Sequence, residues 1–211
     1  MQVLIYSDVH GNLPAFEQLL KKEKYVDAYI NLGDLVNYGP WSNECVELAL
    51  SMDNSVHIMG NHEESFLEGT YPGTNAMVQK AFHHTLKEFT RFDEIKDFQE
   101  QYQLDDFVCR HTILDQYIYP DTEVMLDNNY VVGHSHHQFE YAYEKFVLYN
   151  AGSIGQNRKF INKADYLIYD SESKKIEMRS LIFDIDIVIN KMISRKYPEE
   201  VIQYYQSKSR V

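Results

Sequence analysis

The stretch "QVLIYSDVHGN", residues 2–12, opens the chain with an apolar run that changes abruptly into polar residues. Residues 2–6 are typical of a buried strand, and Gly11 suits the turn that follows it. The same stretch places Asp8 and His10 two positions apart, directly after the strand. A carboxylate and an imidazole leaving one strand end can bind a common cation, but they also suit an ordinary turn. This stretch alone leaves both interpretations open.

Two more short apolar runs follow at the spacing of a βαβ pattern. Residues 27–31 and 55–59 are predicted to be strands. Helices are predicted from Pro14, a residue favoured in the first helical turn, and over residues 42–52. Because strands alternate with helices, this half of the chain should form a parallel sheet.

The second half of the chain is richer in strands. A helix capped by Thr74 is expected first, and a helical tail is expected from about residue 184. Between them, strands are predicted over 106–111, 130–134, 146–150, 164–170 and 175–183, and the aromatic run 141–149 is interpreted as one alternating strand. Because nothing marks a domain boundary, residues 1–211 are predicted to form a single α/β domain with two sheets and helices outside them.

The composition argues against several classes of function. The 211 residues are 44% apolar and carry a net charge of −12 with nine histidines counted as neutral. Such a surface repels polyanions and argues against a general nucleic-acid-binding protein. Cys45 and Cys109 have no CxxC spacing, so a thiolate metal site is not expected. The first apolar run is too short for a signal peptide and no run reaches 18 apolar residues, so we expect a cytoplasmic protein without membrane contact.

Polar residues gather where the predicted strands end, and ligands of open α/β sheets bind at that edge. Four motifs follow apolar runs: "SDVHGN" (7–12), "GDLVNYG" (33–39), "GNHEE" (60–64) and "VVGHSHH" (131–137). Together with His111, which ends the predicted strand 106–111, these motifs supply two carboxylates, one amide and four imidazoles. The residues are Asp8, His10, Asp34, Asn61, His111, His134 and His136. Without a thiolate, the set suits divalent transition ions, with manganese or iron favoured over zinc or nickel. Seven ligands are too many for one tetrahedral ion and fit two.

The four motifs, in this order, resemble the signature of the calcineurin-like metallophosphoesterase superfamily. "YGPWSNECVELAL" (38–50) and "NAGSIGQNR" (150–158) are similar to its small bacterial and archaeal phosphodiesterase branch, which includes diadenosine-tetraphosphatase-like proteins. The resemblance extends to about residue 184 and implies a four-layer α/β/β/α sandwich. It also implies hydrolysis of a small phosphodiester or nucleotide by a hydroxide held between two metal ions.

The resemblance divides the seven candidate ligands into two sets that share Asp34 as a bridge. The first set is Asp8, His10, Asp34 and His136, and the second is Asp34, Asn61, His111 and His134. His62 would face the substrate as general acid or transition-state stabiliser. Glu63 and Glu64 are expected to begin a helix, where negative charge is favourable, rather than to bind metal.

Departures from the family pattern concern the substrate. Asn37 and Tyr38 stand where the phosphoprotein-phosphatase branch has Asp and Arg, which argues against a phosphoprotein substrate. Both are candidate substrate contacts, and Arg158 is a candidate phosphate contact with a surface role as its alternative. Specificity is expected to come from the loops near Tyr38 and Trp41 and from the loops 65–90 and 112–128, which have no readable code.

Two classes of function remain after these observations. An active phosphoesterase is favoured by the intact ligand set over a scaffold or binding protein that keeps the fold without turnover. Within the enzyme class, a nuclease is the alternative. The sequence does not indicate the oligomeric state or a role for His137, and His57, His83 and His84 are expected to be structural or surface residues.

Overall fold

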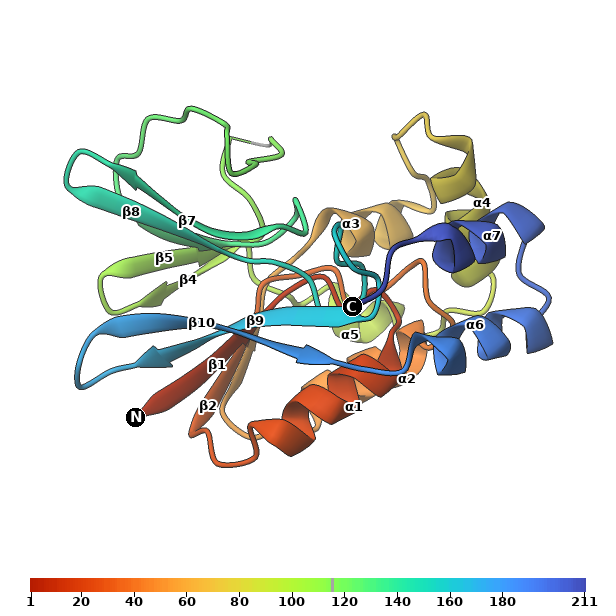
Figure 1. The fold of residues 1–211 in the computed structure, drawn as a ribbon, viewed down its shortest axis with the longest axis horizontal. Helices are drawn as coiled ribbons and strands as arrows, with labels where there is room; N and C mark the ends of the chain where they lie inside the picture. Colours follow the sequence, from red (N-terminus) through yellow and green to blue (C-terminus); the bar gives the residue numbers. More distant parts are fainter. Residues whose placement is uncertain (115) are drawn as a thin grey trace.

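The computed structural model describes residues 1–114 and 116–211, and two five-stranded sheets packed face to face form its centre (Figure 1). The first sheet has the order β10-β9-β1-β2-β3, and its strands are β1 (Gln2–Tyr6), β2 (Ala28–Asn31), β3 (Ser55–His57), β9 (Lys163–Asp170) and β10 (Lys175–Ile182). The second has the order β4-β5-β6-β8-β7, and its strands are β4 (Gln101–Leu104), β5 (Phe107–Arg110), β6 (Asn129–Val132), β7 (Gln138–Tyr143) and β8 (Phe146–Ala151).

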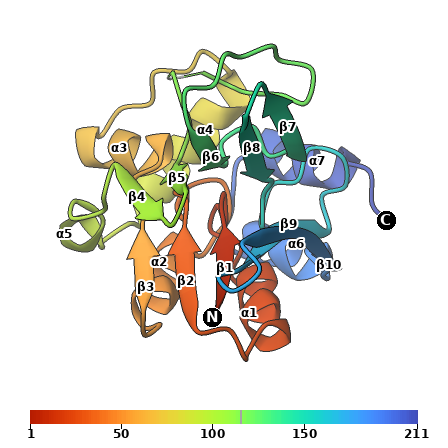
Figure 2. The same cartoon turned by 90° about the vertical axis from the view of Figure 1, so that its left-hand side faces the viewer.

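The predicted parallel arrangement is confirmed for the first half of the chain. Figure 2 shows β1, β2 and β3 side by side and running in one direction, and their pairing is parallel. The later strands β9 and β10 extend this sheet in antiparallel fashion, while β5, β6 and β8 form a parallel centre in the second sheet. The carboxyl ends of β1, β2 and β6 are therefore available for the loops that carry the polar motifs.

The described residues form seven helices. They are α1 (Leu13–Lys22), α2 (Ser42–Leu50), α3 (Asn61–Glu68), α4 (Ala76–Leu86), α5 (Phe92–Ile95), α6 (Ile185–Ser194) and α7 (Glu199–Ser207). Helices α1 and α2 cover the outer face of the first sheet, whereas α3, α4 and α7 gather beyond the carboxyl end of β1 (Figure 1). Within the described part of 112–128, irregular chain rather than a helix covers the outer face of the second sheet.

Alternation along the strands creates separate apolar layers. In β1, Val3 and Ile5 face the second sheet, whereas Leu4 and Tyr6 face the helices. This is the period-two pattern of a strand that is buried on both sides, and it explains why the run 2–6 is continuously apolar. The sandwich of two sheets in an α/β fold, predicted from the sequence, is confirmed.

Two local predictions are wrong. Residues 141–149 form a hairpin rather than one strand, because the chain reverses at Glu144 and Lys145 between β7 and β8. A two-residue turn preserves the alternation of side chains, so the pattern alone does not reveal it. Helix α4 is capped by Asn75 rather than Thr74, since the Asn75 side chain accepts the backbone N–H groups of residues 77 and 78.

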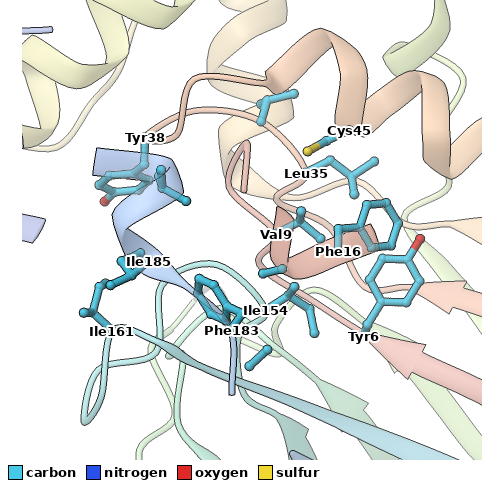
Figure 3. Close-up of a cluster of buried hydrophobic side chains, with 14 of the residues drawn as sticks. Tyr6, Val9, Phe16, Leu35, Tyr38, Cys45, Ile154, Ile161, Phe183 and Ile185 are labelled. Carbon is cyan, nitrogen blue, oxygen red and sulfur yellow. The ribbon is translucent and has the colours of Figure 1, made fainter. Parts of the chain in front are cut away.

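The helical tail predicted from about residue 184 is present, and it packs into the main core. Figure 3 shows Phe183 and Ile185 beside Ile161, in the same cluster that holds Phe16 of α1 and Cys45 of α2. This shared core supports the expectation of one domain over 1–211, which stays a prediction. Among the residues that the structure describes, no helix is both long and apolar enough to cross a membrane.

Candidate metal centre

Five of the seven candidate ligands lie in sharp turns at the carboxyl ends of β1, β2 and β6, while Asn61 begins α3 and His111 follows β5. These five have a left-handed backbone, with φ of 56° at Asp8, 49° at His10, 59° at Asp34, 68° at His134 and 60° at His136. This conformation costs a residue with a side chain about 1–2 kcal/mol. Such strain persists where the surrounding structure enforces it, and it clusters at functional sites.

Three side chains form a first group around Asp8. Its Oδ1 atom lies 3.0 Å from Nε2 of His136 and 3.6 Å from Nε2 of His10, and the two imidazole nitrogens are 3.2 Å apart. Oδ2 of Asp8 accepts the backbone N–H of His134 at 3.0 Å, which directs Oδ1 into the group. The three side chains are buried and close enough to share one cation.

A second group surrounds Nε2 of His111. This atom lies 3.4 Å from Oδ2 of Asp34, 3.0 Å from Nδ1 of His134 and 3.1 Å from Oδ1 of Asn61. Oδ2 of Asp34 is also 3.7 Å from Nε2 of His10 in the first group. Asp34 therefore lies between the two groups, where a bridging carboxylate is predicted.

Hydrogen bonds on the far side of the imidazole rings decide which ring nitrogen faces the other members of each group. In each of three rings Nδ1 bonds a backbone carbonyl: Val36 for His10 (3.0 Å), Leu32 for His111 (2.8 Å) and Gln156 for His136 (2.9 Å). Because a carbonyl only accepts hydrogen bonds, Nδ1 carries the proton and Nε2 of the neutral ring presents a lone pair to the group. Oδ1 of Asp8 is likewise buried without a donor among the described residues. The groups thus expose lone pairs to one another, and a cation would satisfy them.

The electrostatics also favour positive charge at this position. Burial alone would raise the pKa of Asp34, but the neighbouring His111 and His62 hold it well below its usual range. Burial lowers the pKa of His134 and of His136 to about 4, so both rings are neutral at physiological pH, as metal ligands must be. At His111 the attraction of Asp34 outweighs burial and raises the pKa to about 10. The negative charge of Asp34 therefore favours a positive charge at this ring, which either a proton or a metal ion on Nε2 supplies.

His62 approaches the same groups but presents a different atom. Its Nε2 lies 4.0 Å from Oδ2 of Asp34, and its ring stacks on Tyr71 with centroids 5.3 Å apart. Nδ1 lies 2.8 Å from the amide nitrogen of Asn37. The amide oxygen of Asn37 accepts the backbone N–H of Tyr38 and the hydroxyl of Thr85, which fixes the amide orientation. Nδ1 of His62 must therefore accept, so the neutral ring carries its proton on Nε2.

Of the three candidate substrate contacts, Asn37 lies behind His62 rather than beside open space. It is fully buried, and its amide is committed to the contacts just described. The Tyr38 ring packs edge-on against His10, with centroids 4.7 Å apart. Arg158 is half-buried, and one of its guanidinium nitrogens donates to the Tyr204 hydroxyl at 3.1 Å. No carboxylate pairs with it among the described residues, although its charge acts on Tyr38 and His136.

Sequence reasoning missed the role of Glu63 in shaping the site. The residue begins α3 as predicted, but its buried carboxylate accepts four backbone N–H groups, those of Gly60, Asp34, Leu35 and Val36, at 2.7–3.2 Å. It thus joins the loop after β2 to the loop after β3. Burial raises the pKa of Glu63 to about 7 despite these bonds. Only the tertiary approach of the two loops identifies this role.

An open pocket of about 410 Å³ adjoins the second group. Its lining combines site residues with residues of β5 and neighbouring loops: Met59, Asn61, Glu64, Glu100, Arg110, His111, Thr112 and His134. On another side of His134, the exposed Tyr117 stacks on the imidazole with centroids 3.9 Å apart. Tyr71 and Tyr117 belong to the loops 65–90 and 112–128, so both predicted specificity loops reach the site.

The remaining histidines lie outside the two groups. His57 stacks on Phe98, and His84 contacts the Tyr197 ring. His83 is exposed, with Nδ1 on the carbonyl of residue 79. His137 follows the last motif and meets the edge of Tyr119, 5.7 Å away.

Comparison with known proteins identifies the class. The family model for calcineurin-like phosphoesterases matches residues 1–169. An uncharacterised protein of Methanocaldococcus jannaschii is 30% identical over 93% of this chain and 94% of its own length. The chain therefore belongs to the calcineurin-like phosphoesterase family and is a phosphoric ester hydrolase by class.

Solved structures confirm the fold over nearly the whole chain. A metallophosphoesterase from Sphaerobacter thermophilus has a TM-score of 0.80 at 22% identity, covering 98% of both chains. A hypothetical protein from Pyrococcus horikoshii gives 0.76 at 16% identity, covering 97% of both. A protein described as a candidate diadenosine tetraphosphatase gives 0.60 at 15% identity, covering 85% of this chain and 93% of its own.

Proposed function

We propose that the protein hydrolyses a small phosphodiester or nucleotide with the aid of two divalent transition metal ions. Asp8, His10, Asp34 and His136 would hold one ion, and Asp34, Asn61, His111 and His134 the other. The proposal rests mainly on the orientation of three imidazole rings. His10, His111 and His136 each donate the Nδ1 proton to a backbone carbonyl, so that Nε2 of the neutral ring can present its lone pair to a metal ion. Manganese and iron suit this set of imidazole, carboxylate and amide ligands best.

Bound paired metals supply an activated water and a positive clamp for the phosphoryl oxygens. The residues of the chain supply orientation and a hydrogen-bond donor. His62 is placed to donate the Nε2 proton, because Asn37 occupies its Nδ1 and is itself held by Thr85. Burial lowers the pKa of His62 to about 3 against the attraction of Asp34, so the ring acts in its neutral form as a hydrogen-bond donor to the leaving oxygen.

The substrate would lie between Arg158 and the open pocket. A half-buried guanidinium that has no carboxylate partner within residues 1–114 and 116–211 suits a phosphate oxygen, because an anion satisfies both its charge and its donors. The pocket of about 410 Å³ has the size of a small-molecule site and can take the leaving group beside His134. The net charge of −12 favours such a soluble ester over nucleic acid. A nucleotide substrate agrees with the solved structure described as a candidate diadenosine tetraphosphatase, which is 15% identical to this chain.

The test combines metal analysis with a substrate panel. Elemental analysis after reconstitution with manganese should give close to two ions per chain. The reconstituted protein should hydrolyse small phosphodiesters or nucleotides faster than single-stranded DNA or phosphopeptides. Absence of bound metal would refute the two-metal site. Metal binding without turnover would indicate a binding protein, and preference for DNA would indicate a nuclease.

A further inference from the structure

Helix α7 lies outside the segment that matches the family model, yet it packs against the candidate site. The match ends at residue 169, and α7 spans Glu199–Ser207. The helix contacts α4 and α6, its Val201 side chain is buried in the main core, and Glu200 pairs with Lys80 of α4. Figure 1 shows it beside α4, beyond the carboxyl end of β1. Two polar side chains of α7 form hydrogen bonds with residues of the candidate site or its support.

The first polar link runs from α7 to the candidate phosphate contact. The Tyr204 hydroxyl accepts a hydrogen bond from the Arg158 guanidinium at 3.1 Å. No other hydrogen bond or ion pair of the guanidinium is present among the described residues. An arginine side chain has many rotamers, and a single bond that selects one of them lowers the entropy cost of binding an anion.

The second link runs from α7 to a candidate metal ligand. Tyr205 is fully buried, and its hydroxyl accepts a hydrogen bond from the side-chain amide of the equally buried Gln156. The backbone carbonyl of Gln156 in turn accepts the Nδ1 proton of His136 at 2.9 Å. Tyr205 therefore fixes the residue that orients the His136 ring. Contacts of this outer kind typically change metal affinity about 10- to 100-fold when the direct partner is removed.

We propose that α7 positions the site from outside the family core, with Tyr204 holding Arg158 for the substrate phosphate and Tyr205 holding Gln156 for His136. This inference rests on the proposed function. Neither tyrosine is a catalytic residue, because each acts through another side chain. The two links predict two separable defects, which a purely structural role of the helix would not produce.

Tyr204→Phe removes the first hydroxyl and keeps the ring. Inorganic phosphate should bind the manganese-loaded protein about three- to tenfold more weakly, the usual effect of one lost hydrogen bond. Manganese content should stay at the wild-type level, and KM should rise more than kcat falls. Calorimetric titration with phosphate measures the effect. Wild-type phosphate affinity in this variant would overturn the first link.

Tyr205→Phe leaves the buried amide of Gln156 without its partner. Manganese affinity, measured by titration of the metal-free protein, should fall by about three- to tenfold, since the change is one step removed from the contact to His136. Unchanged manganese affinity would overturn the second link.

Tyr197→Phe is the matched control in the same tail. Tyr197 is buried between α6 and α7, but no hydrogen bond of its hydroxyl is present among the described residues. The control should keep wild-type phosphate and manganese affinity with a similar melting temperature. Equal losses in all three variants would mean that the tail contributes stability only, which contradicts the proposal. Both binding measurements remain readable even if the protein hydrolyses none of the tested esters, so failure of the proposed function would be distinguishable.

Discussion

Residues with a left-handed backbone occur in two regions of this molecule for different reasons. In exposed turns they include Asn54, Asp105, Glu144 and Lys174, which reverse or redirect the chain. At the carboxyl ends of β1, β2 and β6 the same conformation occurs in buried residues that form the candidate metal centre. In the turns a glycine would serve better, whereas in the site the side chain itself is required. The comparison separates strain that is incidental from strain that positions functional groups.

The two regions also differ in what enforces the conformation. The turn at Glu144 is closed by the β7–β8 hairpin itself. At the site, distant segments hold the backbone: the Asp8 carbonyl accepts the Ser153 hydroxyl at 2.7 Å and the Gly155 N–H at 3.0 Å. A Cβ atom on Gly133 would lie 1.9 Å from Oγ of Ser7, so this approach requires glycine.

Asp34→Asn should have the largest effect, because it removes a charge at the position that both groups share. Metal stabilisation of a phosphoryl transition state is worth several kcal/mol, so turnover should fall about 1000-fold or more on every substrate. Metal content should fall further than in Asn61→Ala, which removes a neutral ligand from the second group alone. Elemental analysis of both variants measures this. Full metal content in Asp34→Asn would contradict the bridging position.

His62→Ala should keep both metals and the fold but lose the Nε2 hydrogen bond to the leaving oxygen. Hydrolysis of alkyl esters should fall about 100- to 1000-fold, the usual cost of removing one hydrogen bond to a developing oxyanion. Hydrolysis of p-nitrophenyl esters should fall much less, because nitrophenolate leaves without help. Equal losses on both ester types would indicate stabilisation of the equatorial oxygens instead. Loss of metal would show that His62 is a ligand, as its proximity to His10 and Asp34 permits.

Glu63→Gln tests the junction that holds the site's loops together. The amide cannot accept all four backbone N–H groups, and its own NH2 would face donors. We expect a loss of about 2–4 kcal/mol in the free energy of unfolding, since buried donors would lack partners. The control is Glu68→Gln on the exposed part of the same helix, which should change stability by less than about 0.5 kcal/mol. Urea denaturation of the metal-free proteins compares them, and equal stabilities would rule out this role.

Glu144→Gly should have the smallest effect and the opposite sign. Its φ of 53° costs a residue with a side chain about 1–2 kcal/mol, while glycine adds about 0.5–1 kcal/mol of unfolded-state entropy. A net gain of about 0.5 kcal/mol is therefore expected in urea denaturation. Glu144→Ala retains the Cβ atom and should show no gain. Stabilisation by both variants would attribute the effect to the lost charge rather than to the backbone.

The sequence by itself determined the class of fold and the side chains that gather at its centre. Each candidate ligand follows an apolar run, and strand ends of a parallel sheet meet at one edge, so local patterns were enough to bring Asp8, Asp34 and His134 together. The assignment of Asn61 and His111 to the same group came from the resemblance to the family rather than from the local patterns. These are short-range signals, carried by a few consecutive residues.

Only the tertiary structure decided how that centre is supported. The position of Asn37 behind His62, three of the four bonds of Glu63 and the contacts of α7 with Gln156 and Arg158 join residues 25–49 positions apart in the chain. The hairpin within 141–149 was also hidden, because a two-residue turn keeps the alternation of the strands around it. Side-chain hydrogen bonds between distant segments have no periodicity, since they depend on where the packed core places each backbone group.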